Sequence, residues 1–208
     1  MSRICTAEVI WSWIQLENKT RNYFPCASKF KEVNCDDENM LKELFMCLKS
    51  KRNYIEVLPS DWGLRELDCN DIFDIELIGD WTEAFSRSYL LGRKNNARNA
   101  AETIRNIMCS GNIEQEIEKL AKAYRTATKK NVQDIKHDMF DVLNNFDKVR
   151  SYLSYPLILE CVKDKLRIID GDHRAIVAAV ECLNHKSVTL RAYVGRNHFN
   201  YAREFGLR

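Results

Sequence analysis

The sequence contains few of the residues that interrupt regular structure. Only 3 prolines and 7 glycines occur among 208 residues, so long disordered linkers are not expected. No apolar run approaches the roughly 18 residues of a membrane-spanning helix, which predicts that no membrane is a partner. The N-terminus also lacks the basic, apolar and small-residue segments of a secretion signal. A cytoplasmic location is therefore expected.

The cysteines lack the spacing of a zinc module. The chain has 8 of them, at positions 5, 26, 35, 47, 69, 109, 161 and 182. None forms a Cys-x-x-Cys pair, whereas zinc fingers and ribbons use closely spaced ligand pairs. Without a secretion signal, these cysteines are expected to be reduced, mostly buried thiols in a cytoplasmic protein.

Hydrophobic residues make up 45% of the chain, enough for a sizeable core, and their periodicity changes along it. Apolar residues at helical spacing predict helices over 6–16, 36–48 and 80–91. The pattern stays helical from 95 to about 151, with breaks at 110–112 and 129–131 and long helices over 113–128 and 134–152. Strands are predicted over 54–58, ended by Pro59, and over 157–162, 165–169 and 188–194. The segments 175–183 and 200–205 are expected to be helical.

The most informative stretch runs from Leu166 to Leu183. A β-branched run ends at Asp170-Gly171, and the polar residues Asp172, His173 and Arg174 then open an apolar helix. The first N–H groups of a helix and the positive end of its dipole attract anions. Arg174 adds positive charge at that end, which a bound anion explains better than helix stability does. The stretch therefore predicts a phosphate-binding turn.

Each residue of this turn also has a structural explanation. Gly171 suits a positive φ or a close backbone approach, and also any tight turn. Arg174 suits bidentate phosphate binding, or a salt bridge to a helix carboxylate. His173 suits a phosphate contact or proton transfer, or an ordinary structural hydrogen bond. Asp170 suits catalysis, or acceptance of backbone N–H bonds that fix the turn.

The same residues carry a family resemblance. Ile168-Ile-Asp-Gly-Asp-His-Arg174, with Ala178-Ala179 behind it, resembles the Asp-Gly-x-His-Arg element of the ParB/sulfiredoxin superfamily, which includes free-serine kinases and DGQHR-type proteins. The resemblance covers roughly residues 153–195, and Ile55–Arg65 is similar to the family's opening strand and turn. It implies an α+β fold with a small mixed sheet of ParB/sulfiredoxin type and a large helical insertion.

On this basis we expect a single domain over residues 1–208. Its parts are an N-terminal helical segment over 1–52, a ParB/sulfiredoxin-like core over 53–92 and 153–208, and a helical insertion over 93–152.

The resemblance also implies roles for the site residues. Asp170 is placed as the base for a substrate hydroxyl or as a partner of Mg²⁺, and His173 as a second catalytic group. Gly171, Asp172, His173 and Arg174 are placed around the phosphates of ATP or another nucleotide. Arg65 and Glu66 fall roughly where the family places polar residues that face the nucleotide, and both also suit a solvated surface. Sulfiredoxins have a cysteine where this chain has Asp172, so their sulfinic-acid repair chemistry does not carry over.

The resemblance therefore favours a nucleotide-binding enzyme, a phosphotransferase (kinase) or NTPase with a small-molecule or nucleic-acid acceptor. The alternative is a non-enzymatic DNA-binding or regulatory module of ParB-like or DGQHR type. Residues 91–208 hold 21 Lys/Arg against 14 Asp/Glu, whereas residues 1–90 hold 11 against 16. This basic C-terminal half, including Arg191, Arg196 and Arg203, is compatible with DNA and equally with solvated helix faces.

Overall fold

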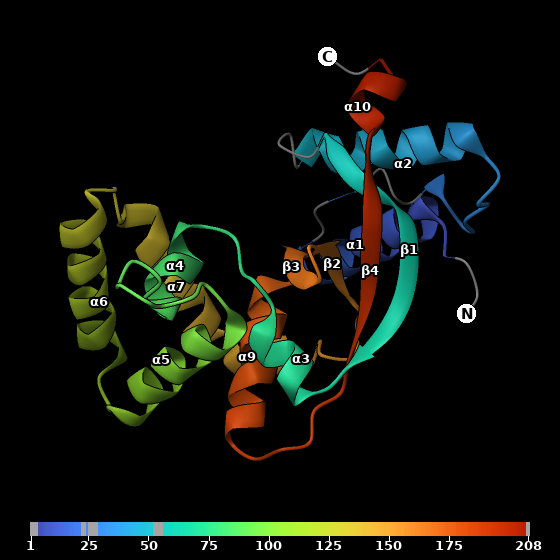
Figure 1. Ribbon diagram of the computed structural model, residues 1–208. Coiled ribbons are helices and arrows are strands. Elements are labelled where there is room, and N and C mark those ends of the chain that lie inside the picture. The colour runs from blue at the N-terminus through green and yellow to red at the C-terminus, as the bar shows by residue number, and fades with distance from the viewer. Residues whose placement is uncertain (1–3, 22–23, 25–28, 52–55, 207–208) are drawn as a thin grey trace. The chain divides into compact units, whose positions relative to one another are not determined.

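The computed structural model describes residues 4–21, 24, 29–51 and 56–206 (Figure 1). These residues form ten helices and one four-stranded sheet, so the α+β class is confirmed. The chain divides into two compact units. Unit 1 comprises Met1–Arg65, Ile158–Cys161 and Tyr193–Arg208, and unit 2 comprises Glu66–Leu157 and Val162–Ala192.

The elements follow one another as α1 (Thr6–Arg21), α2 (Glu38–Lys51), β1 (Val57–Leu67), α3 (Cys69–Asp74), α4 (Asp80–Ser86), α5 (Ala97–Cys109), α6 (Ile113–Thr128), α7 (Gln133–Asn144), α8 (Phe146–Arg150), β2 (Leu157–Val162), β3 (Lys165–Asp170), α9 (Asp172–Leu183), β4 (Leu190–Asn200) and α10 (Tyr201–Glu204). The strand order is β1-β4-β2-β3, so β1 and β3 are the edge strands. No helix of the described segments has the length and apolar character that crossing a membrane requires.

A small polar cluster lies within the apolar core of unit 1. The Thr6 hydroxyl lies 2.9 Å from the Tyr201 hydroxyl, and Trp62 Nε1 donates to the same Thr6 oxygen over 3.2 Å. The Tyr201 ring packs in turn on Phe45 of α2. Thr6 is therefore both the first residue of α1 and a packing residue of this core.

The predicted strand over 54–58 is wrong in its end point. Residues 54 and 55 lie outside the described part of the chain, but β1 continues through Pro59 as far as Leu67. Proline cannot donate a ladder hydrogen bond, and an edge strand such as β1 tolerates this loss. A Cβ on Gly195 of β4 would overlap the Pro59 side chain, so glycine is required there.

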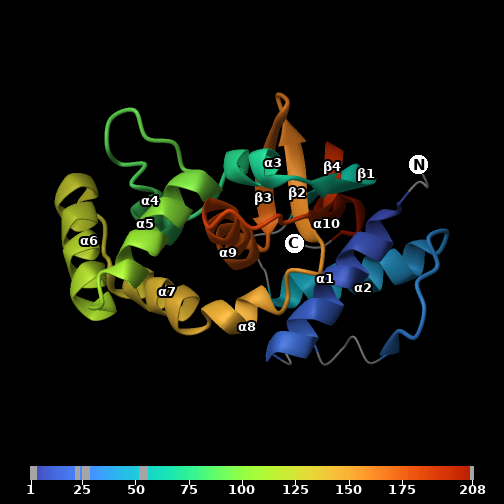
Figure 2. The same cartoon turned by 90° about the horizontal axis from the view of Figure 1, so that it is seen from below.

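In unit 2, helix α9 packs against α3, α5 and α8 (Figure 2). Its residues from Arg174 to Cys182 are all buried. A disulfide from Cys69 to Cys182 joins the start of α3 to the last turn of α9. Helix α9 is therefore fixed at its far end while its first turn carries the Asp172-His173-Arg174 cluster.

The two strands predicted before this turn are confirmed, and they form a hairpin. Strands β2 and β3 are joined by Lys163 and Asp164, whose φ values of 51° and 62° are those of a type I′ turn. Residues 93–152 contain α5 to α8, and α6 has the bounds that the periodicity predicts. The predicted helix over 134–152 is instead two helices, because the chain leaves helical geometry at Asn145 (φ −107°, ψ 17°).

The prediction of reduced, buried thiols is wrong. Cys5 is bonded to Cys35, Cys69 is bonded to Cys182, and Cys47 is also disulfide-bonded. Cys109 and Cys161 are free thiols, the first exposed and the second half-buried. The two described pairs are 30 and 113 residues apart in sequence, yet each has a Cα–Cα distance of 5.7 Å. Spacing along the chain does not reveal such pairs. Cys26 lies outside the described residues.

Candidate functional site

The turn between β3 and α9 has the strand–turn–helix geometry that the sequence predicts. Strand β3 ends at Asp170, Gly171 adopts φ 103° and ψ 26°, and α9 begins at Asp172. A Cβ on Gly171 would lie 2.7 Å from Leu157 Cδ2 and 2.8 Å from Arg174 Nη2. Glycine is therefore required both for its backbone conformation and for the close approach of its neighbours.

Helix α9 starts without a side-chain cap. Gly171 occupies the N-cap position and has no side chain to accept from the first N–H groups of the helix. Its carbonyl accepts from Ala175 N over 2.9 Å, the first regular bond of α9. Half-buried Asp172 is the acidic residue of the first turn, where a negative charge suits the helix dipole. The first N–H groups of α9 therefore receive no bond from a capping side chain, and Asp172 supplies the negative charge at this helix end.

The guanidinium of Arg174 is directed into the protein. Only 6% of Arg174 is exposed, and its Nη1 donates to Tyr155 O over 2.9 Å and to Pro156 O over 2.7 Å. Its Nη2 donates to Asp170 Oδ2 over 3.1 Å. These contacts match the salt-bridge alternative, with the carboxylate at the end of β3 in place of one on a helix. They fix the segment before β2 against the turn.

Asp170 shares this environment. It is 9% exposed, and its carboxylate accepts from the Arg174 guanidinium. The pair therefore has a clear structural part in the turn. Among the described residues, the group of three close metal-ligating side chains lies in unit 1 and does not include Asp170. The Mg²⁺ role of Asp170 stays a prediction.

His173 is held by residues that the sequence did not indicate. Its Nδ1 lies 3.9 Å from Asp141 Oδ2 on α7, and its side chain is 24% exposed. The Trp81 indole of α4 meets the imidazole edge to face, with 5.0 Å between ring centroids. Asp141 is itself positioned by Asn145 Nδ2, which donates to its other oxygen over 2.7 Å. A carboxylate beside an imidazole can orient the ring.

Helix α4, which carries Trp81, is anchored by a second polar cluster. Tyr124 of α6 donates to Glu83 Oε2 over 2.8 Å, and Lys130 Nζ lies 2.5 Å from Asp80 Oδ1 and 3.3 Å from Glu83 Oε2. Burial, together with the hydrogen bond to Glu83, raises the pKa of Tyr124 to about 12. The hydrogen bond to Asp80 raises the pKa of Lys130 above its usual range. The contacts between Tyr124 and Glu83 connect α6 to α4, and Lys130, which follows α6, adds ion pairs to the same helix.

Arg65 and Glu66 are exposed residues of β1. The family resemblance placed them after a turn, whereas the strand is continuous at this point. Arg65 is the last residue of the first segment of unit 1, whereas the Asp170–Arg174 turn lies in unit 2. Their contact with a nucleotide stays a prediction.

The basic residues of the C-terminal half are distributed unevenly. Arg191 belongs to unit 2 and donates to Ser154 O over 3.2 Å, whereas Arg196 and Arg203 are exposed residues of unit 1. On α6, Lys119 pairs with Glu116 over 2.7 Å. Such pairing is typical of a solvated helix face.

No protein-family model, no curated protein and no solved structure matches this chain.

Proposed function

We propose that the chain is a nucleotide-binding enzyme of ParB/sulfiredoxin type, a phosphotransferase or NTPase, in which the start of α9 holds the phosphates. The observation that carries this proposal is the left-handed Gly171 followed at once by a twelve-residue helix without a side-chain cap. Its first backbone N–H groups and the positive end of its dipole suit a phosphate group. ATP or another nucleotide with Mg²⁺ is the proposed ligand.

The proposal assigns different parts to the two basic residues of the turn. His173 sits at the start of α9 beside Asp141 and Trp81, and it is the side chain proposed to contact the phosphates or transfer a proton. Arg174, whose guanidinium donates three hydrogen bonds inside the protein, is proposed to hold the turn in shape. Asp170 would do the same, and would orient an acceptor hydroxyl only after leaving Arg174.

The test is a thermal-shift panel of ATP, ADP, CTP and GTP, each with and without Mg²⁺. A ligand at about 100 times its Kd adds roughly 2.7 kcal/mol, which is about 5–10 °C for a chain of this size. A shift with at least one nucleotide is the expected result. If no nucleotide shifts the melting temperature at millimolar concentration, the proposal is wrong.

A matched pair of variants locates the site. His173→Asn removes the imidazole at the start of α9 and should weaken nucleotide binding roughly tenfold or more, as expected for a lost hydrogen bond to a charged group. His185→Asn changes an exposed histidine with φ 59° after the end of α9, a conformation that asparagine accepts. This control should bind as the parent does. Equal affinity in all three proteins would remove His173 from the site.

The second candidate is a non-enzymatic DNA-binding module, favoured by the exposed end of β4. The last five residues of β4, from Arg196 to Asn200, are all exposed and include His198 and Phe199. An exposed arginine and an exposed aromatic ring on the same strand segment suit a nucleic-acid strand. Replacing Arg191, Arg196 and Arg203 by glutamate should then abolish binding in an electrophoretic titration. Tight, salt-sensitive DNA binding without a nucleotide shift would make this module the better account.

A further inference from the structure

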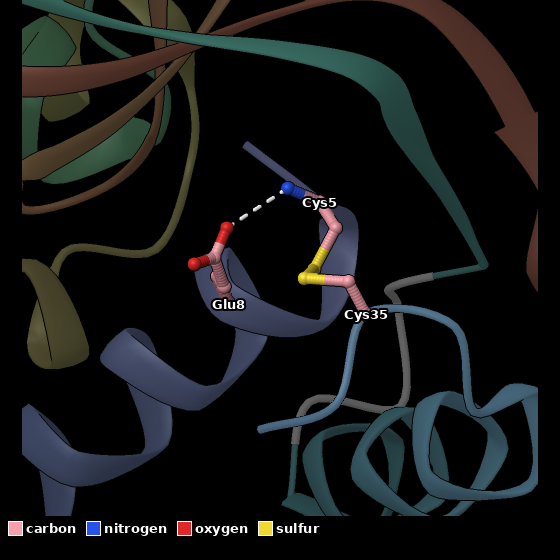
Figure 3. A group of neighbouring side chains, drawn as sticks. All are labelled: Cys5, Glu8 and Cys35. Carbon is pink, nitrogen blue, oxygen red and sulfur yellow. Dashed lines mark hydrogen bonds between the residues drawn. A yellow bond between two sulfur atoms is a disulfide. The ribbon is translucent and has the colours of Figure 1, made fainter. Parts of the chain in front are cut away.

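Three side chains in unit 1 converge on one point of the surface. Cys5, Glu8 and Cys35 each offer one ligand atom, and these atoms all lie within 4.8 Å of one another (Figure 3). The two cysteines form a disulfide, and Glu8 Oε2 accepts from Cys5 N over 3.0 Å. Glu8 and Cys35 are exposed and Cys5 is half-buried, so ions in solution can reach the group.

Local structure fixes both cysteines. Cys5 immediately precedes α1, and its neighbour Ile4 forms an antiparallel bridge to Trp62 of β1. Cys35 lies in a short turn before α2, where Asn34 Oδ1 accepts from Asp36 N over 3.1 Å and Asn34 O accepts from Asp37 N over 3.3 Å. Helices α1 and α2, which follow these two segments, pack against each other, so the disulfide is not the only connection between the two parts.

The group has the composition of a zinc site once the disulfide is opened. Thiolates and carboxylates are both common Zn²⁺ ligands, and three protein ligands leave a fourth position for water. Cys5 immediately precedes α1, where the positive end of the helix dipole suits an anionic ligand group such as a thiolate. Glu8 lies in the first turn of α1, on the same side as the sulfur atoms (Figure 3).

We propose that the Cys5–Cys35 disulfide is the metal-excluding form of a zinc site made by Cys5, Cys35 and Glu8. A dithiol reductant supplies two electrons and two protons, the S–S bond breaks into two thiols, and the reductant becomes a disulfide. Zn²⁺ then displaces the two thiol protons into solution and binds both sulfur atoms and the Glu8 carboxylate. Since the same sulfur atoms serve either state, disulfide and zinc are mutually exclusive.

This site is independent of the proposed nucleotide site. The spacing of the cysteines in the sequence does not predict it. Zinc motifs recognised in sequences have closely spaced ligand pairs, whereas Cys5 and Cys35 are 30 residues apart. The pair Cys5 and Glu8 has a suitable spacing, but the carboxylate gives no signal by itself. The fold supplies the third ligand.

The experiment compares zinc binding by the oxidised and the reduced full-length protein. Zn²⁺ is titrated in competition with a chromophoric chelator, and Co²⁺ is used as a spectroscopic probe of thiolate coordination. We expect no binding at this site in the oxidised protein and about one equivalent in the reduced protein, with a thiolate-to-cobalt charge-transfer band. Equal zinc binding in both states, or none after reduction, would overturn the proposal.

Variants separate this site from the other cysteines. Cys5→Ser and Cys35→Ser should each weaken binding by more than about a hundredfold, since even outer-shell changes cost 10- to 100-fold. Glu8→Gln keeps a group that accepts from Cys5 N but loses the anionic ligand, and should weaken binding at least about tenfold. Glu43→Gln makes the same charge change at an exposed position of α2 and should have no effect.

A double variant, Cys69→Ala with Cys182→Ala, removes the other described disulfide and should leave the zinc stoichiometry unchanged. Circular dichroism checks that each variant is folded. Zinc binding that survives Cys5→Ser and Glu8→Gln but disappears in the double variant would assign the metal to other thiols and refute the proposal.

Discussion

At the scale of single residues, Arg174 shows how a motif side chain can be used for structure. Its guanidinium joins three acceptors from two places in the chain, Tyr155 O, Pro156 O and Asp170 Oδ2. The Asp170 carboxylate is buried, and the two carbonyl acceptors are partly buried. The part of Arg174 in positioning the turn is therefore separable by experiment from the part of His173 in binding.

We predict that Arg174→Ala lowers the free energy of unfolding by about 3–5 kcal/mol, because it leaves the buried Asp170 charge without its partner. The measurement is urea denaturation followed by circular dichroism. Arg167→Ala breaks an ion pair with Glu76 between side chains that are 39% and 36% exposed, and should cost less than about 1 kcal/mol. Equal losses in the two variants would contradict the buried role of Arg174.

Sequence reasoning identified the Asp170–Arg174 turn but not its surroundings. The glycine, the acidic residues and the following apolar helix are local signals, and they predicted both the turn and the start of α9. Trp81 and Asp141 lie 92 and 32 residues before His173 in the sequence, and only tertiary packing brings them to it. Such partners leave no periodic signal, because the sequence does not distinguish them from other tryptophan or aspartate residues on helices.

At the scale of elements, the periodicity of apolar residues predicted helix bounds well, whereas a single proline did not predict where a strand ends. The bounds of α6 were predicted, and its end at Lys129 coincides with a left-handed residue (φ 63°). The sequence did not predict that β1 extends through Pro59, because proline usually interrupts a strand. A strand tolerates proline when it lies at the edge of a sheet, as β1 does. Edge position is a property of the assembled sheet.

The contact between α4 and α6 leads to a prediction about alkaline pH. The pKa of Tyr124 is raised to about 12 from 10.0, so the folded state favours the protonated phenol. Its contribution to stability is complete below pH 10 and is lost as the pH rises from 10 through about 12. The pKa of Lys130 is raised as well, which gives a loss of the same sign.

We therefore expect the free energy of unfolding to fall between about pH 10 and pH 12, and to fall less in Tyr124→Phe than in the parent protein. Urea denaturation at a series of pH values measures this slope. Tyr193→Phe, a half-buried tyrosine of unit 1, is the control and should keep the parent slope. A parent-like slope in Tyr124→Phe would show that the α4–α6 cluster does not govern the alkaline loss.

At the scale of the whole molecule, the disulfides are at odds with the cytoplasmic location expected from the sequence. Disulfides persist in oxidising compartments and are rare in the reducing cytosol. The location stays a prediction, and the redox state of the cysteines in cells bears on it directly. Thiol alkylation followed by mass spectrometry shows whether Cys69 and Cys182 are bonded to each other or are free thiols.

The same disulfide should contribute strongly to stability. It closes a loop with a sequence separation of 113 within unit 2, and the chain-entropy account predicts a larger effect for long loops. Cys69→Ala with Cys182→Ala should lower the free energy of unfolding by about 2–4 kcal/mol, measured in urea without reductant. Adding reductant should then change the parent protein more than the variant. No difference between variant and parent would mean that the bond is not formed in solution.

The order of strands β1 and β4 has a consequence for how the chain is made. These neighbours in the sheet are separated by the 122 residues between Leu67 and Leu190. A ribosome adding 5–20 residues per second needs roughly 6–24 s to cross that interval. During this time β1 has emerged without its hydrogen-bonding partner, while the helices of unit 2 are already available to pack. Unit 1 therefore closes late in synthesis, and a chaperone that recognises unpaired strands would meet β1 first.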